Sequence, residues 1–235
     1  MSETILDISD VSSGYGEAMV LRNVTLGIRP GEIFALLGKN GMGKSTLLKT
    51  ILGFVPAQQG SIHLFGEDIT ALPTHLIARK AIAYTPQEQT LFQDLTVEEN
   101  LRLGRRNDRG FAEGLARVSE YFPIVGKRLS QKAGTLSGGE QKMLIVCRAL
   151  LGSPRLMLID EISEGLQPSM IQRLSEILLA ERRRAGTAIF VVEQNVPFAF
   201  SMADRYAVLK IGEIADDGVA GDERAAARVQ QQLQL

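Results

Sequence analysis

A glycine-rich stretch constrains the fold more than any other part of the chain: Gly38-Lys39-Asn40-Gly41-Met42-Gly43-Lys44-Ser45-Thr46. It matches the pattern G-x-x-x-x-G-K-S/T. An apolar run at residues 33–37 comes before it, and a run typical of a helix at residues 47–52 comes after it. A strand, a glycine loop and a helix start form the context that a phosphate-binding loop requires. The sequence therefore predicts a nucleotide-binding core rather than a glycine-rich turn that binds nothing.

The residues of this loop have separate expected roles. Glycines let the backbone curl so that successive N–H groups point inward, and the following helix adds its positive N-terminal end. We expect Lys44 to reach the β and γ phosphates, and the Ser45 hydroxyl to ligate the magnesium ion that accompanies the nucleotide. The predicted nucleotide-binding residues of the loop are Gly38, Asn40, Gly41, Gly43, Lys44, Ser45 and Thr46.

Composition narrows the class of protein. Of the 235 residues, 45% are hydrophobic and 23% are charged, as is ordinary for a soluble globular protein. The net charge of −1 argues against a general affinity for nucleic acid, which usually accompanies a basic excess. The basic cluster Arg182-Arg183-Arg184 is better explained as the solvated end of a helix. No nucleic-acid partner is expected.

Cysteine content and hydropathy indicate where the protein works. Cys147 has no cysteine partner within the chain, so a reducing, cytoplasmic setting is expected. Residues 1–7 lack the basic start and apolar core of a signal peptide, and no apolar run approaches the ~18 residues of a membrane span. If the protein acts at a membrane, we expect it to dock onto another subunit that crosses it.

The start of the chain has the pattern of a strand-rich subdomain. Residues 4–8, 20–28 and 61–65 alternate in polarity or carry β-branched side chains. Tyr15 is expected in a turn between such runs. There it either stacks on a nucleotide base, since any base offers a π-face, or is a surface residue without a partner.

A helical block interrupts this α/β pattern. From about residue 72 to 151, apolar residues recur at three- and four-residue intervals. We predict one domain that spans the whole chain, with a helical subdomain at approximately 88–152 inserted into a nucleotide-binding core of residues 1–87 and 153–235. The tail from residue 221 is expected to be helical.

A second anion site is predicted at Leu136-Ser137-Gly138-Gly139-Glu140-Gln141. Ser137 is a good N-cap for the helix that follows, and the paired glycines leave the N-terminus of that helix open. A plain cap followed by a turn is the alternative. Two glycine-fronted helix starts in one chain suggest that both bind the same phosphate chain.

Two adjacent carboxylates end a buried-strand run, Leu156-Met157-Leu158-Ile159-Asp160-Glu161. Successive strand residues point to opposite sides, but both carboxylates can face a nucleotide where the chain leaves the sheet. We expect Asp160 to hold magnesium through its water shell and Glu161 to orient and polarise the attacking water. A charged strand end without a function is the alternative.

Together, Gly38 to Thr46, Gln87, Leu136 to Gln141 and Leu156 to Glu161 resemble the ATP-binding cassette family over essentially the full length of the chain. The resemblance implies an α/β fold in which a P-loop NTPase core carries an antiparallel β subdomain and an inserted helical subdomain. It further implies two cassettes that face head to tail. Each ATP would lie between the phosphate loop of one cassette and Ser137 to Gln141 of the other.

The resemblance also implies roles for single residues. Tyr15 would stack on adenine, Gln87 would contact magnesium and the γ-phosphate, and a permease helix would be received near Gln87 to Glu99. The implied catalytic residues are Glu161, Gln87 and Gln194, and the implied metal ligands are Ser45, Gln87 and Asp160. The implied nucleotide contacts from the second anion site are Ser137, Gly138, Gly139 and Gln141.

The chain departs from the family pattern around the carboxylates. Ile162 and Gln167 stand where the family usually has proline and aspartate, and Gln194 stands where it has a histidine that contacts the γ-phosphate. Glutamine donates and accepts hydrogen bonds but takes no proton at neutral pH, so it can position groups without acid/base chemistry. Slower hydrolysis, or a cassette that binds ATP without turning it over, is one interpretation.

Three strings, residues 96–101, 163–169 and 191–195, resemble one branch of the family: importers of branched-chain and other hydrophobic amino acids, with relatives for urea and short amides. The implied function is the ATP-binding subunit of such an importer, peripheral on the cytoplasmic face of the inner membrane. Its implied partners are membrane permease subunits, a second, different cassette or a second copy, and indirectly a solute-binding protein. A cassette ATPase of DNA repair or translation is the competing class, which the single cassette and the absence of a heptad run disfavour.

Overall fold

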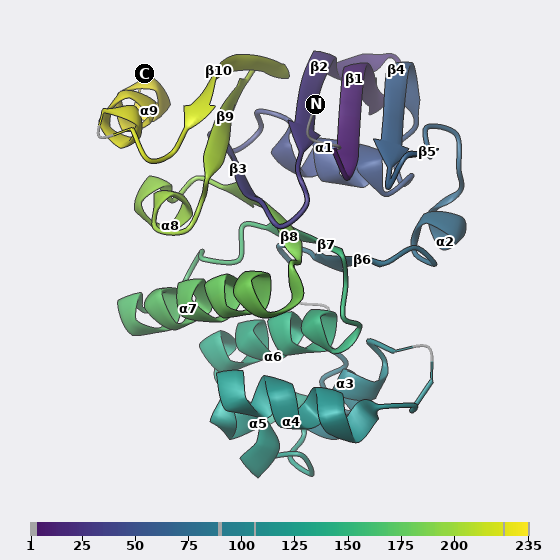
Figure 1. Ribbon diagram of the computed structural model, residues 1–235, viewed down its shortest axis with the longest axis vertical. Coiled ribbons are helices and arrows are strands. Elements are labelled where there is room, and N and C mark those ends of the chain that lie inside the picture. Colours follow the sequence, from purple (N-terminus) through teal and green to yellow (C-terminus); the bar gives the residue numbers. More distant parts are fainter. Residues whose placement is uncertain (1–3, 89–90, 106, 223, 235) are drawn as a thin grey trace.

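Two β-sheets form the upper half of the molecule in Figure 1. The computed structural model describes residues 4–88, 91–105, 107–222 and 224–234. Its strands are β1 (Leu6–Tyr15), β2 (Ala18–Ile28), β3 (Ile33–Leu37), β4 (Ala57–Leu64), β5 (Glu67–Asp68), β6 (Ile82–Thr85), β7 (Leu156–Asp160), β8 (Ala188–Glu193), β9 (Arg205–Lys210) and β10 (Glu213–Val219). One sheet has the order β10-β9-β3-β8-β7-β6, with β10 antiparallel to β9 and the other pairs parallel. The other sheet, β2-β1-β4-β5, is antiparallel, so the predicted α/β fold is confirmed.

Helices cover the sheets and form the lower half of the molecule (Figure 1). They are α1 (Lys44–Ile51), α2 (Thr74–Ile77), α3 (Val97–Arg102), α4 (Phe111–Tyr121), α5 (Pro123–Lys127), α6 (Gly138–Leu151), α7 (Pro168–Ala185), α8 (Val196–Phe200) and α9 (Ala225–Gln234). The tail is helical, as expected. The helical pattern predicted from residue 72 is interrupted by the short β6, which pairs with β7. The division of the chain at residues 88 and 152 stays a prediction.

The turn predicted around Tyr15 is shorter than expected: it comprises Gly16 and Glu17 and joins β1 to β2 directly after Tyr15. Residues 12–14 belong to β1 and pair with β2 and β4, and Tyr15 is the last residue of the strand. These turn-type residues are satisfied inside the sheet: the Ser13 hydroxyl lies 2.9 Å from the hydroxyl of Thr50 and donates to the Pro56 carbonyl at 2.9 Å. At Gly14 a Cβ atom would lie 2.0 Å from the Ala18 carbonyl oxygen. Glycine is therefore required by close approach of two strands, not by a turn.

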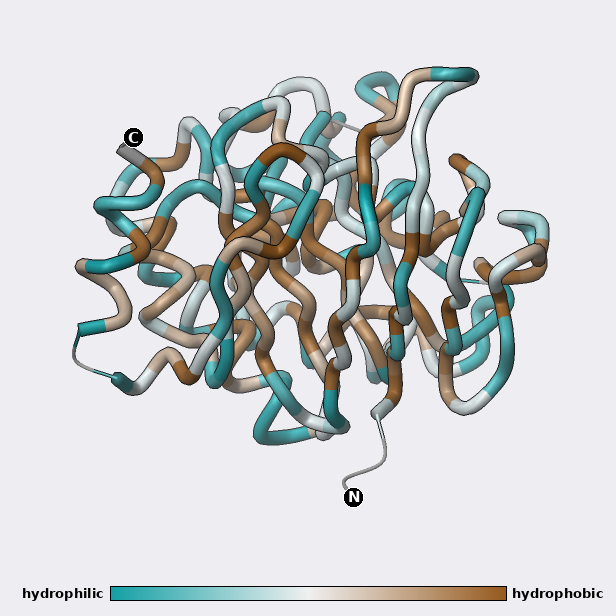
Figure 2. The backbone as a smooth tube through the Cα atoms, turned by 90° about the horizontal axis from the view of Figure 1, so that it is seen from above, coloured by the Kyte–Doolittle hydropathy of each residue, from teal (hydrophilic) through white to brown (hydrophobic). Residues whose placement is uncertain are grey.

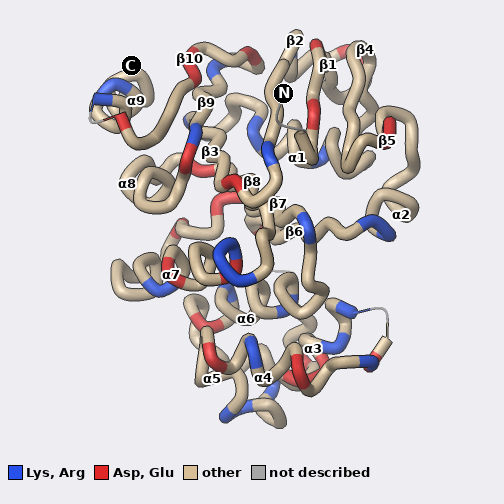
Figure 3. Tube along the Cα trace, viewed as in Figure 1, with Lys and Arg blue, Asp and Glu red and all other residues tan. Residues whose placement is uncertain are grey.

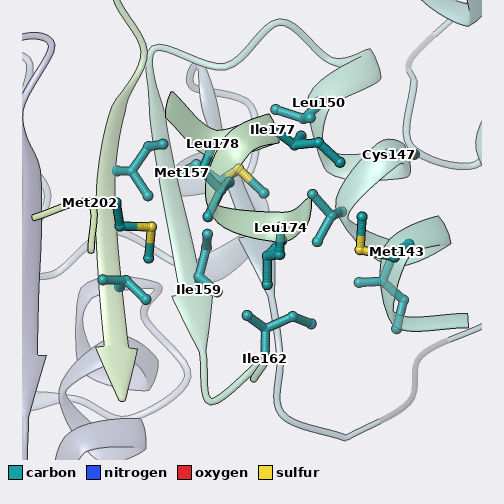
Figure 4. Packing of buried hydrophobic residues seen from close by; sticks show 14 of the residues in the cluster. Met143, Cys147, Leu150, Met157, Ile159, Ile162, Leu174, Ile177, Leu178 and Met202 are labelled. Atoms are coloured by element: carbon teal, nitrogen blue, oxygen red, sulfur yellow. The ribbon is translucent and has the colours of Figure 1, made fainter. Parts of the chain in front are cut away.

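The central sheet separates two hydrophobic cores. In β7, Leu156 and Leu158 pack on the side of the antiparallel sheet and α1, whereas Met157 and Ile159 pack on the side of α6 and α7. Successive strand side chains point to opposite faces, and a parallel sheet covered on both faces is apolar on both. Figure 2 shows hydrophobic (brown) stretches running through the middle of the molecule, and Figure 4 shows α7 side chains between β7 and Cys147 of α6. Burial raises the pKa of Cys147 to about 12.

The basic cluster lies at the end of α7, as predicted. That helix ends at Ala185, and Gly186 adopts the left-handed conformation that closes it. Arg182 pairs with Asp204 at 2.9 Å, and Arg184 pairs with Glu181 at 2.7 Å. Acidic and basic residues are interspersed along the trace (Figure 3). Within the described residues, no helix is both long enough and apolar enough to cross a membrane.

Candidate nucleotide-binding site

The phosphate loop joins the fully buried strand β3 to α1. Gly41 and Gly43 have φ angles of 78° and 104°, which residues with a Cβ atom rarely adopt. A Cβ atom at Gly43 would also lie 2.9 Å from the Leu21 side chain of the neighbouring sheet. The loop opens onto a hollow of about 390 Å³. Its walls are Val20, Asn40, Gly41, Gly43, Lys44, Ser45, Thr46, Gln87 and Glu161.

Asp160 and Ser45 meet at the edge of this hollow. The Ser45 hydroxyl donates to Oδ1 of Asp160 at 3.0 Å, and the Tyr84 hydroxyl donates to Oδ2 at 3.3 Å. Burial raises the pKa of the Asp160 carboxyl, although the hydrogen bond from Ser45 opposes the shift. Burial also raises the pKa of Tyr84, with the charge of Asp160 adding to the effect. Tyr84 therefore remains a hydroxyl donor to the carboxylate.

Glu161 lies directly against the phosphate-loop lysine. Its Oε1 is 2.8 Å from Nζ of Lys44, and each side chain is only 3% exposed. The same Nζ donates to the Lys39 carbonyl at 2.8 Å. Asp160 and Glu161 thus face one site although they are neighbours in sequence. Glu161 has left the strand with a positive φ of 46°, which redirects its side chain.

Two glutamines converge on the second oxygen of Glu161. The amide of Gln87, beyond β6, donates to Oε2 at 3.0 Å, and the amide of Gln194, beyond β8, donates to it at 3.2 Å. Gln87 also donates to Glu164 at 3.1 Å. Glu161 therefore contacts both of the other residues predicted as catalytic, Gln87 and Gln194, and Lys44 as well.

The second anion site predicted from the sequence would lie at the N-terminus of α6. Ser137 caps the helix: its hydroxyl accepts from the Glu140 N–H at 3.4 Å, and the Glu140 carboxylate accepts from both the N–H and the hydroxyl of Ser137. The paired glycines had suggested an open helix start. The Glu140 carboxylate instead occupies the donors of Ser137, so the helix start is closed. Gln141 is 7% exposed and donates to the Leu136 and Ala133 carbonyls, so its amide supports the loop in this structure.

Several predicted site residues do not line the hollow. Ser137, Gly138, Gly139 and Gln141 are absent from its walls, and so is Tyr15, whose side chain is 52% exposed at the end of β1. Gly138 has no described neighbour that a Cβ atom would meet within 4 Å. Within a single chain, residues 137–141 therefore do not share the hollow with the phosphate loop.

The departures from the family pattern have local consequences. Ile162 is 2% exposed and belongs to the core on the α6 and α7 side. Gln167 is the N-cap of α7 but makes no side-chain capping bond. An aspartate there is among the best capping residues, so this helix lacks a stabilising contact that the family's usual residue can supply.

Sequence reasoning missed four residues around the site. Val20 of β2 forms an apolar wall of the hollow, and Tyr84 holds Asp160. Ser163 and Glu193 are buried and bonded to each other next to Glu161. Tyr84 could have been predicted from the sequence, because it lies in the strand β6 that leads to the site, only three residues before Gln87. The other three depend on pairings between distant segments.

Comparison with known proteins identifies the family. The family model described as ABC transporter matches residues 21–164. The chain is 44% identical over 220 residues to the high-affinity branched-chain amino acid transport ATP-binding protein BraG of Pseudomonas aeruginosa, covering 92% of this chain and 94% of the relative. It is 28% identical over 237 residues to BraF of the same organism, covering 93% and 92%.

A solved structure agrees with this result. It is described as the ATP-binding subunit of an ABC transporter, is 28% identical, covers 98% of both chains and superposes with a TM-score of 0.84. Fold, phosphate loop and sequence similarity thus lead to one conclusion. The chain belongs to the ATP-binding cassette family and is the subunit of an ABC transporter that binds ATP and hydrolyses it to drive transport.

Proposed function

We propose that this chain is the ATP-binding subunit of an importer for branched-chain amino acids. The observation that carries the proposal is the 44% identity to BraG over nearly the whole of both chains. The strings at residues 96–101, 163–169 and 191–195 support it as well. A urea or short-amide importer is the alternative, which residues 164–169 favour slightly.

Lys44, Ser45, Gln87, Asp160, Glu161 and Gln194 form the proposed catalytic group. The Ser45 hydroxyl and an Asp160 carboxylate oxygen lie 3.0 Å apart, and hard oxygen ligands of this kind suit Mg²⁺. Ser45, Asp160 and the Gln87 amide would hold the ion, which neutralises phosphate charge when bound. Glu161 accepts a proton from the attacking water or orients it, and Gln194 fixes the carboxylate by its amide N–H.

Two cassettes are proposed to close around ATP. Ser137 to Gln141 lie outside the hollow of their own chain, so they are free to cover the phosphate loop of another subunit. The Glu140 carboxylate on Ser137 would repel a phosphate, so closure requires the Ser137 hydroxyl to turn from Glu140 to the ligand. The similarity to BraG and BraF, two cassettes of one organism, favours a second, different cassette over a homodimer. Exposed Tyr15 is proposed to stack on adenine.

The permease is proposed to dock in a larger hollow of about 740 Å³. Residues 78–84 and 103–105 and the C-terminal half of α6 form its walls. This differs from the segment 87–99 expected from the resemblance. Docking there would hold the chain at the cytoplasmic face of the membrane and connect it only indirectly to a solute-binding protein. The hollow adjoins β6 and hence Gln87, so a bound permease helix would sense the nucleotide site.

An uptake assay tests the proposed solute. The chain is combined with its permease, second cassette and binding protein in proteoliposomes, with ATP inside. We expect ATP-dependent accumulation of labelled leucine and no accumulation with Glu161→Gln. Uptake of urea or acetamide without leucine would support the alternative importer. ATP hydrolysis stimulated by nucleic acid, without uptake, would point to the competing class.

Leu103 provides a test of the docking surface. It is 54% exposed and lines the larger hollow. Leu103→Glu is expected to weaken binding to the permease by about tenfold or more, because it replaces an exposed apolar side chain that lines the hollow by a charge that loses its hydration on binding. ATP hydrolysis by the isolated chain should not change. Val219→Glu, at a somewhat more exposed position (62%) on β10, is the control and should bind normally. Equal binding by both variants would place the docking surface elsewhere.

A further inference from the structure

Glu161 has a backbone conformation that residues with side chains rarely adopt. Its φ of 46° lies in the left-handed region, where the Cβ atom crowds the backbone. Such a conformation persists only where the surrounding structure holds it in place. The contacts of the residues around Glu161 therefore decide where its carboxylate points.

A buried carboxylate from the neighbouring strand holds the segment after Glu161. Glu193, the last residue of β8, is 2% exposed. Its Oε1 accepts from the Ser163 N–H at 3.0 Å, and its Oε2 accepts from the Ser163 hydroxyl at 2.9 Å. The N–H of Glu161 itself donates to the Val192 carbonyl at 2.9 Å. The end of β8 thus fixes residues 161 and 163, on either side of the buried Ile162.

The same carboxylate holds the loop that carries Gln194. Oε2 of Glu193 lies 3.3 Å from the backbone nitrogen of Gln194 and 3.5 Å from that of Asn195. The Gln194 amide in turn donates to Glu161. Glu193 therefore reaches Glu161 by two routes, one through Ser163 and one through Gln194.

The chemistry of this contact requires an ionised carboxylate. Ser163 supplies two donors and the following loop supplies backbone N–H groups, so both oxygens of Glu193 must accept. Burial raises the pKa of Glu193, and the hydrogen bonds from Ser163 oppose that shift. In the described part of the chain, no lysine or arginine forms an ion pair with Glu193. A buried carboxylate without a cation is costly to the fold, which disfavours a purely stabilising role.

We propose that Glu193 is a positioning residue for ATP hydrolysis: it fixes the Glu161 carboxylate by holding Ser163 and the backbone of Gln194. The proposal rests on the assignment of hydrolysis to Glu161. Lys142 of α6 assists from the other side, since its ammonium donates to the Ile162 carbonyl at 3.3 Å and to that of Glu164. In the segment after Glu161, the Glu193 carboxylate thus accepts from the donors of Ser163, and the Lys142 ammonium donates to two backbone carbonyls.

The test compares Glu193→Gln, Ser163→Ala and the double variant. Glutamine keeps the volume of Glu193 but turns an N–H₂ group towards donors. We expect kcat to fall by about 10- to 100-fold in Glu193→Gln, because a misplaced carboxylate is a poor base. The Kd for Mg-ATP and the KM should stay within about twofold, since the phosphate loop is intact. Ser163→Ala should lose less, and the double variant should be no slower than Glu193→Gln.

Glu32→Gln is the control at a second buried glutamate, which differs from Glu193 in pairing with Arg205 at 3.2 Å. Glu32 is also buried, at 5% exposure, and also accepts a backbone N–H, from Arg29 at 2.7 Å, but it lies before the other end of β3. It should lower the melting temperature and leave kcat unchanged. Wild-type kcat in Glu193→Gln, losses that multiply in the double variant, or an equal loss of kcat in Glu32→Gln would each overturn the proposal. Glu161→Gln is measured alongside: full activity there would instead overturn the assignment of Glu161.

Discussion

Replacing Glu161 by glutamine is expected to slow ATP hydrolysis by about 10²- to 10⁴-fold while nucleotide binding persists. Glu161 is the carboxylate in contact with Lys44, Gln87 and Gln194, so its position matches that of a group acting on the terminal phosphate. Glutamine keeps its shape but cannot accept a proton at neutral pH. Phosphate release in a single turnover, with ATP binding measured separately, gives the two quantities.

Glu164→Gln is the control for this prediction. Glu164 shares the Gln87 donor, at 3.1 Å, but its side chain is exposed and it makes no contact with Lys44. It should hydrolyse ATP within about threefold of the wild-type rate, as expected for a surface substitution. Equal single-turnover rates for wild type and Glu161→Gln would mean that this chain binds ATP without using Glu161, in favour of the inactive-cassette interpretation.

Lys44→Met is expected to lower the affinity for Mg-ATP by about 10- to 100-fold, because a hydrogen bond to a charged group is worth roughly 1.5–3 kcal/mol. It should also destabilise the nucleotide-free protein. The lysine and Glu161 form a buried ion pair, and removal of one partner leaves an uncompensated charge. Such a change costs up to about 3–5 kcal/mol. The amides of Gln87 and Gln194 still donate to Glu161 and reduce this loss.

The double variant Lys44→Met with Glu161→Gln separates the two effects. Both partners are then neutral, so the melting temperature should recover relative to Lys44→Met while Mg-ATP affinity stays low. Lys49→Met, an exposed lysine on the same helix, should change neither quantity. If the double variant were no more stable than the single one, the ion pair would not govern the stability of the empty site. The measurements are thermal unfolding and titration with a fluorescent nucleotide.

The sequence predicted most of the site because its parts are local patterns. The phosphate loop, the Ser137 cap and the strand ending at Asp160 each follow from spacing and residue type within one short segment. The inclusion of Tyr15 in β1 could not be predicted, because it depends on distant partners of the strand. The Ser13 hydroxyl, two residues earlier, bonds to the Thr50 hydroxyl of α1 and to the Pro56 carbonyl before β4. Residues with turn propensity can form part of a strand when distant partners accept hydrogen bonds from their polar side chains or donate hydrogen bonds to them.

The parts that could not be predicted depend on pairings between distant segments. The contact of Glu193 with Ser163 spans 30 positions of sequence. The left-handed φ of Glu161 has no sequence signal, because glutamate is not a residue that favours it. The carboxylate on Ser137 was visible as a capping-box pattern, but the glycines had suggested an open helix start.

The alternation of β7 between two cores has a consequence for how such subunits diverge. The odd positions Met157 and Ile159 pack with the helices that lead to the larger hollow, whereas Leu156 and Leu158 pack with α1 and the antiparallel sheet. Substitutions in α6 and α7 that suit another membrane partner therefore contact only one of the two rows of β7 side chains, Met157 and Ile159. The second row, Leu156 and Leu158, packs with α1, so sequence divergence on the helical side of β7 can leave the packing behind the phosphate loop unchanged.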